Sequence, residues 1–132
     1  MRPNQGALST GTTLEDLRTV APAFAKYTEG PLLGELWQRA DLSPRDRSII
    51  TVAVLIARNQ PMEMPYYFNL ALDNGVKPTE ISEIITHLAF YSGWANATAA
   101  AALAKAVFAR RGLSERTRAQ KTVALRFSAR TR

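Results

Sequence analysis

The stretch Gln60–Gly75, QPMEMPYYFNLALDNG, decides how the rest of this sequence is read. A helix tolerates proline only in its first turn, and asparagine or glycine accepts the left-handed conformation that ends one. The prolines at the start of the stretch and the Asn74-Gly75 pair at its end therefore predict a helix from about Met62 to Asp73. Glu63 and Tyr67 are four residues apart and share one face of this helix.

The segment before this helix has a strong helix-start signature. Ser43-Pro44-Arg45-Asp46 supplies a side-chain cap, a proline in the first helical position and an early carboxylate. The predicted helix runs to about Ala57. It is apolar all round from Ile49 onward, which predicts a buried helix. Its early arginines either pair with acidic neighbours or solvent, or one of them, Arg47, meets a carboxylate of a substrate or partner subunit.

The segment after it predicts another helix, which begins near Lys77-Pro78 and ends before Gly93. His87, the only histidine, lies beside the apolar stripe of this helix and four residues after Glu83. That spacing suits an ion pair. A structural role for His87 and a role in a pocket both remain open, because a histidine side chain exchanges a proton near neutral pH.

The two ends of the domain are also predicted to be helical. A helix begins near Thr13 and is bent or ended by Pro22, and a second helical piece covers about Pro31 to Arg39.

At the other end, an alanine-rich helix from Gly93 to about Arg111 predicts close helix pairing, because small side chains let backbones approach. Trp94 at its start is interpreted as a core or interface anchor, or as a platform for a ligand.

Three of these segments together resemble the carboxymuconolactone decarboxylase family, within the alkylhydroperoxidase D-like superfamily. The family pattern E-x-x-x-H-x-x-x-A-x-x-x-G is matched by Glu63, Ala71 and Gly75, and family-like flanks follow in the same order, LSPRDRSIITVAVLIA (Leu42 to Ala57) and EIITHLAFYSGWANA (Glu83 to Ala97). The resemblance covers about Leu32 to Gly112. It implies an all-α fold, a compact domain of about six helices that assembles into a ring-like homo-oligomer, a trimer or hexamer.

The sequence departs from the family pattern at one position. Tyr67 stands where relatives usually carry the histidine. An unperturbed phenol has a pKa of about 10 and keeps its proton at neutral pH, so Tyr67 is a poor general base but a good hydrogen-bond donor.

The resemblance implies decarboxylation of a small carboxylated lactone of the 4-carboxymuconolactone type, as in the catabolism of aromatic compounds. Such a reaction needs a proton donor and hydrogen bonds to the charge that develops on the lactone carbonyl. The expected catalytic residues are Glu63 as proton carrier, Tyr67 as oxyanion donor and His87 as a further source of proton chemistry. The expected substrate-binding residues are Arg47, Tyr66 and Trp94.

Two simpler interpretations stay open beside this one. Glu63 is also explained as a helix-start carboxylate stabilised by the helix dipole, and the Tyr66-Tyr67 pair as packing. The alternative function is a catalytically silent oligomeric binding protein that kept the fold and the pocket after losing the histidine. Either way, no cofactor is expected, because one histidine, no cysteine and no phosphate-binding glycine loop leave little to hold one.

The absence of cysteine excludes disulfides and thiolate chemistry. Relatives resembling alkylhydroperoxidase D use C-x-x-C just before the histidine, and the corresponding positions here are Gln60 and Glu63. A thiol peroxidase of that kind is therefore rejected.

Length and charge distribution define the expected organisation. The 132 residues suit one domain, divided into a flexible lead-in (1–12), the family-like domain (13–112) and a basic extension (113–132). Residues 1–112 carry 11 Lys and Arg against 10 Asp and Glu, whereas residues 113–132 carry 6 against 1. Since the excess charge is confined to the extension, nucleic-acid binding is not expected of the domain. The chain has no long apolar run, so a cytoplasmic protein without membrane contact is expected.

Overall fold

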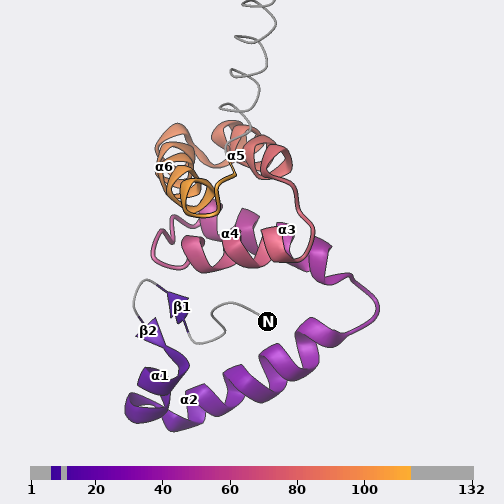
Figure 1. The fold of residues 1–132 in the computed structure, drawn as a ribbon, viewed down its shortest axis with the longest axis vertical. Helices are drawn as coiled ribbons and strands as arrows, with labels where there is room; N and C mark the ends of the chain where they lie inside the picture. The colour runs from indigo at the N-terminus through magenta and orange to yellow at the C-terminus, as the bar shows by residue number, and fades with distance from the viewer. Residues whose placement is uncertain (1–6, 10–11, 114–132) are drawn as a thin grey trace, which may run out of the picture.

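The fold is seen in a computed structural model, which describes residues 7–9 and 12–113. Six α-helices dominate this part of the chain (Figure 1). In order, the elements are β1 (Ala7–Ser9), β2 (Thr12–Thr13), α1 (Leu14–Val20), α2 (Pro22–Tyr27), the π-helix η1 (Thr28–Glu35), the 3₁₀-helix η2 (Leu36–Gln38), α3 (Pro44–Ala57), α4 (Met64–Asp73), α5 (Pro78–Ser92) and α6 (Trp94–Arg110). The predicted set of about six helices is confirmed over these residues. The sequence did not predict the short antiparallel pairing of β1 and β2.

The first four helical elements, α1 to η2, form an elongated helical arm beside the bundle of α3 to α6 (Figure 1). Pro22 ends α1 and opens α2, as predicted. Pro31 lies inside η1 rather than at the start of a helix. Proline cannot donate a backbone hydrogen bond and its ring clashes with the preceding turn, so the wider π-helical turn accommodates it.

The core lies among α3, α4, α5 and α6, and each of these helices contributes to it. Its largest fully buried apolar side chains are Phe68, Ile56, Met64, Ile81 and Val52. From α6 the core receives mainly small side chains, Ala100 and Ala104, together with Val107. Because these alanines are buried where α6 packs on α5 and α4, the predicted close pairing of the alanine-rich helix is confirmed within the chain.

The start of α3 has the predicted cap. The Ser43 hydroxyl accepts a hydrogen bond from the Asp46 N–H at 3.1 Å, and Pro44 is the first helical residue. The prediction that α3 is buried on all sides is wrong for the single chain, since Ile50 and Val54 are 52% and 47% exposed. The cause is packing on one side only: α4 and α5 cover the face that carries Val52 and Ile56.

Helix α4 begins at Met64, two residues later than predicted, with Glu63 at its cap. It ends as predicted at Asn74, followed by Gly75 with a positive φ of 93°. Gly93 has a φ of 107° and separates α5 from α6. A non-glycine residue would be strained at either glycine, so these two positions define the helix ends of the bundle.

Two predicted regions fall mainly outside the described residues: the lead-in 1–12 and the basic extension 113–132. Over residues 7–9 and 12–113, no helix is both long and apolar enough to cross a membrane.

Candidate functional site

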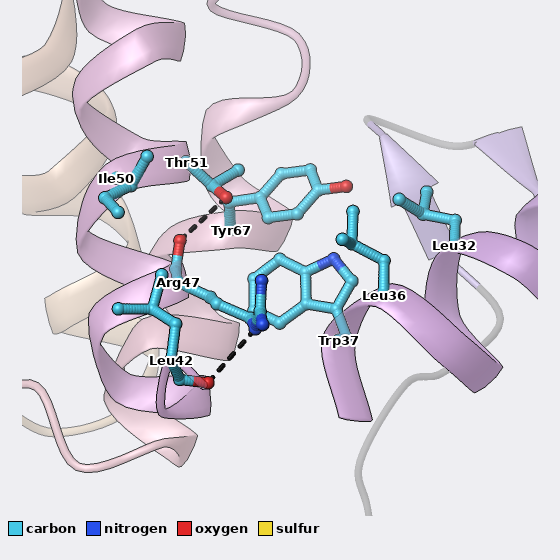
Figure 2. A pocket seen from close by; sticks show the side chains of 8 residues that line it. All are labelled: Leu32, Leu36, Trp37, Leu42, Arg47, Ile50, Thr51 and Tyr67. Atoms are coloured by element: carbon cyan, nitrogen blue, oxygen red, sulfur yellow. Dashed lines mark hydrogen bonds between the residues drawn. The ribbon is translucent and has the colours of Figure 1, made fainter. Parts of the chain in front are cut away.

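A pocket of about 260 Å³ lies where the end of the arm meets α3 and α4 (Figure 2). Most of its lining is apolar, and its polar side-chain groups are one guanidinium, two hydroxyls and one indole N–H. The lining residues are Leu32 from η1, Leu36 and Trp37 from η2, Leu42 from the following loop, Arg47, Ile50 and Thr51 from α3, and Tyr67 from α4. A small ligand that binds here would be transferred from water to a mostly apolar surface that offers few hydrogen-bond partners.

Arg47 is held by backbone carbonyls rather than by a carboxylate. Its Nε donates to the Leu42 carbonyl oxygen at 3.2 Å, and its Nη2 donates to the Arg39 carbonyl oxygen at 3.3 Å. Over the described residues, no Asp or Glu forms an ion pair with it, whereas Arg45 pairs with Glu80 and Asp46. Arg47 is thus fixed in place while its positive charge and its remaining N–H groups are free to receive an anion.

Tyr67 presents a half-buried phenol to the same pocket. Its ring stacks on the Trp37 indole, with centroids 6.4 Å apart and planes at 24°, and meets the edge of Tyr66 at 4.9 Å. Burial raises the pKa of Tyr67 above its ordinary value, and neighbouring Tyr66 and Glu63 raise it further. The phenol therefore stays neutral at physiological pH and acts as a hydrogen-bond donor.

Glu63 lies one turn before Tyr67, and its carbonyl oxygen accepts the Tyr67 N–H at 3.4 Å. Its side chain does not line the pocket. Burial raises the pKa of the Glu63 carboxyl, the direction expected for a proton carrier.

Tyr66 is half-buried beside Tyr67 but does not line the pocket. Burial raises its pKa, and the charge of Asp73, further along the same helix, adds to the effect. Tyr66 therefore contacts the site through the ring of Tyr67.

The structure does not bring His87 or Trp94 to this pocket. The predicted ion pair between Glu83 and His87 is wrong: His87 is exposed and stacks on Tyr91, with ring centroids 4.7 Å apart. Trp94 is 69% exposed and meets Phe90 edge-on at 5.8 Å. His87 is exposed because α5 turns Ile81 toward the core and the opposite face, with His87 and Tyr91, toward solvent, whereas Trp94 is exposed at the first residue of α6.

Sequence reasoning missed most of the pocket lining. Arg47, Ile50 and Thr51 have the i, i+3, i+4 spacing of one helix face, and that spacing was a usable signal. Trp37 belongs to an apolar stripe of the predicted helical piece 31–39, but its partner could not be identified, because Tyr67 is distant in the sequence. Within the described part of the chain, no group of three or more His, Cys, Asp or Glu side chains is placed to hold a metal ion.

The all-α fold agrees with the comparisons to known proteins. The sequence profile of the carboxymuconolactone decarboxylase family matches residues 22–106, more than half of the chain, so the chain belongs to this family. It is 31% identical over 102 residues to 4-carboxymuconolactone decarboxylase of Acinetobacter baylyi, covering 77% of this chain and 76% of the relative. It is also 35% identical over 60 residues to nitrosuccinic acid decarboxylase of Metarhizium robertsii, covering 46% of this chain and 42% of the relative.

Proposed function

We propose that this protein is a cofactor-free decarboxylase of small carboxylated lactones. One observation carries the proposal: an arginine without a carboxylate partner among the described residues is fixed by two backbone carbonyls in an apolar pocket that also receives the Tyr67 phenol. Family membership and the relatives named as decarboxylases support the reaction type. The substrate class of the 4-carboxymuconolactone type is inferred from the relative that covers most of the chain.

Arg47 binds the carboxylate that the substrate keeps. A carboxylate paired with a guanidinium is stabilised in its charged form, and this pairing would oppose its loss as carbon dioxide. The leaving carboxylate instead lies against the apolar wall of Leu32, Leu36 and Ile50. There its charge is poorly solvated, so the transition state, in which that charge moves onto the lactone, is favoured relative to the bound substrate.

Tyr67 and Glu63 complete the reaction. As the carbon–carboxylate bond breaks, its electron pair moves toward the lactone carbonyl, where the Tyr67 hydroxyl donates a hydrogen bond to the developing negative charge. Glu63 is the proposed proton source: its side chain lies outside the pocket lining, one turn before Tyr67, so the proton of its carboxyl form reaches the carbon that lost carbon dioxide through an intervening water molecule, and solvent then restores that proton. His87 and Trp94 have no part in this proposal, because both are exposed to solvent and neither lines the pocket, whereas Glu63 is half-buried one turn before Tyr67.

The alternative is a silent binding protein of the same fold. The tyrosine at the position of the family histidine favours it, because a neutral phenol with a raised pKa cannot replace an imidazole as a base. The same pocket would then bind a carboxylated ligand without converting it.

Release of carbon dioxide from 4-carboxymuconolactone separates the two functions. The decarboxylase predicts turnover by the native protein and its loss in Glu63→Gln, with Glu83→Gln, an exposed carboxylate on α5, as the matched control. Turnover that is absent in the native protein and created by Tyr67→His would establish the silent binder instead.

We also propose that copies of this chain assemble through exposed apolar faces. Val54 on α3 and Phe90, Tyr91 and Trp94 near the junction of α5 and α6 are largely exposed in the single chain. Sedimentation of the native protein should give a species larger than one chain, and Val54→Glu should reduce its mass. A native protein that sediments as a monomer at micromolar concentration would refute assembly.

A further inference from the structure

Trp37 occupies an unusual place in the helical arm, residues 14–38. It is the one large side chain of this segment that is buried, at 9% exposed; the other buried residues of the arm are Ala25 and Thr28. Its neighbour Leu36 is 46% exposed. The arm therefore directs a single large aromatic group inward.

The burial of Trp37 is not explained by the core of the bundle. Trp37 is absent from the buried cluster of α3 to α6, which includes Tyr67 only at its edge. Its ring contact is the stack on Tyr67, and both rings line the pocket, where they face each other from η2 and α4 (Figure 2). The Tyr67 ring is thus held between the indole and the edge of Tyr66.

The residues that follow Trp37 hold the other main polar group of the pocket. The Arg39 and Leu42 carbonyl oxygens accept the hydrogen bonds of the Arg47 guanidinium. Residues 37–42 therefore contact both the phenol and the guanidinium, one through a ring stack and the other through the backbone.

We propose that Trp37 is a positioning residue, which fixes the Tyr67 ring so that its hydroxyl and the Arg47 guanidinium reach the same ligand. The identity of the ligand in this inference rests on the proposed function. The contact between the Trp37 and Tyr67 rings is independent of that function. A phenol ring without the stack would rotate and tilt, and a misplaced hydrogen-bond donor loses much of its effect on a transition state. Loss of an aromatic pair of this kind changes an equilibrium constant or a rate constant by roughly 2- to 10-fold.

A measurement on the Tyr67 ring tests the positioning without any ligand. Tyrosines labelled with ¹³C on the ring give four signals, of which the Tyr67 signal is identified by its loss in Tyr67→Phe. Trp37→Leu should speed the flipping of the Tyr67 ring, while Trp37→Phe, which keeps an aromatic face, should restore slow flipping. Trp94→Leu removes the exposed tryptophan, which does not line the pocket, and should leave the flipping of the Tyr67 ring unchanged. An unchanged Tyr67 ring in Trp37→Leu overturns the proposal.

A double-mutant cycle tests the consequence for the site. Trp37→Leu should lower kcat about 3- to 10-fold with a smaller change in KM, and should have less than about a 2-fold effect when Tyr67 is already phenylalanine. If the native protein only binds 4-carboxymuconolactone, the same cycle is measured on its affinity. Additive losses would show that Trp37 acts independently of Tyr67 and would overturn the proposal. If the native protein neither converts nor binds 4-carboxymuconolactone, the proposed function is refuted. The role of Trp37 is then decided by the measurement on the Tyr67 ring, which needs no ligand.

Discussion

The Nε of Arg47 donates a hydrogen bond to the backbone carbonyl of Leu42 at 3.2 Å, which joins the first turn of α3 to the loop before it. Among the described residues, Arg18, Arg39, Arg45 and Arg111 form ion pairs with carboxylates, as Arg45 does with Glu80. Arg47 instead uses neutral acceptors and keeps its charge uncompensated by any carboxylate of residues 7–9 and 12–113. This difference between two arginines in one turn is the basis for treating Arg47 as the ligand's anchor.

Tyr67→Phe tests the donor role directly, because it removes one hydroxyl and keeps the ring stack. We expect the fold to be unchanged and carbon dioxide release from 4-carboxymuconolactone to fall by about 100-fold, the typical cost of losing an oxyanion donor. Tyr66→Phe is the matched control, since Tyr66 does not line the pocket. Equal losses in the two variants would remove Tyr67 from the mechanism.

Glu63→Gln should stabilise the protein slightly at neutral pH. Burial raises the pKa of Glu63 in the folded state, so the folded protein holds this proton more strongly than the unfolded chain does. The contribution of Glu63 to the free energy of unfolding is therefore fully present below the pKa that Glu63 has in the unfolded chain. It is lost as the pH rises through the pKa that Glu63 has in the folded protein. Thermal melts should show a higher Tm for the variant at pH 7 and no difference at pH 4. A lower Tm at pH 7 would contradict the burial of a charged group.

The ion pair between Glu80 and Arg45 predicts the opposite pH dependence. The hydrogen bond from Arg45, followed by the bond from the Lys77 N–H, lowers the pKa of Glu80 in the folded state. Its contribution is present above the unfolded pKa and is lost as the pH falls through the folded value. Glu80→Gln should lower Tm at pH 7, and the gap should close under acid conditions. Glu35→Gln, which changes an exposed carboxylate on η1, is the control. A difference in Tm between Glu80→Gln and the native protein that persists in acid would argue against the ion pair of Glu80 with Arg45.

Ala100→Leu tests the close packing of α6. Ala100 is completely buried where α6 meets the bundle, so three added carbon atoms have no space to occupy. Overpacking of this kind costs about 1–3 kcal/mol of the free energy of unfolding. Ala102→Leu, exposed on the same helix, should cost little. Denaturant unfolding measures both, and equal stabilities would mean that α6 does not pack as described.

The helix ends were predictable because they depend on local chemistry. Ser43 and Pro44 begin α3, Gly75 follows α4 and Gly93 ends α5, each through a backbone preference that acts within a few residues. The start of α4 was placed two residues too early, because a turn before a proline satisfies the same local pattern. The general order of helices followed from these signals.

The composition of the site was only partly predictable. Tyr67 and Arg47, both singled out in the sequence, line the pocket, whereas the Glu63 side chain does not. Trp37 and the exposure of Ile50 and Val54 depend on which elements pack together over long sequence distances. Periodicity shows that a face is apolar, but not what covers it. The spacing of Glu83 and His87 allowed an ion pair, but the two side chains form none, and His87 stacks on Tyr91.

We propose that a small carboxylated ligand binds in the pocket lined by Trp37 and Tyr67, with the carboxylate that it keeps on Arg47. The chain has two tryptophans, so Trp94→Phe leaves Trp37 as the sole indole emitter. Titration of this variant with 4-carboxymuconolactone should give a saturable change in Trp37 fluorescence, and adding Arg47→Gln should weaken the apparent affinity about 10-fold or more. The matched control Arg58→Gln, at the other end of α3, should leave the affinity unchanged. Fluorescence that does not respond to the ligand, or an affinity that is the same with and without the Arg47 guanidinium, would contradict the account.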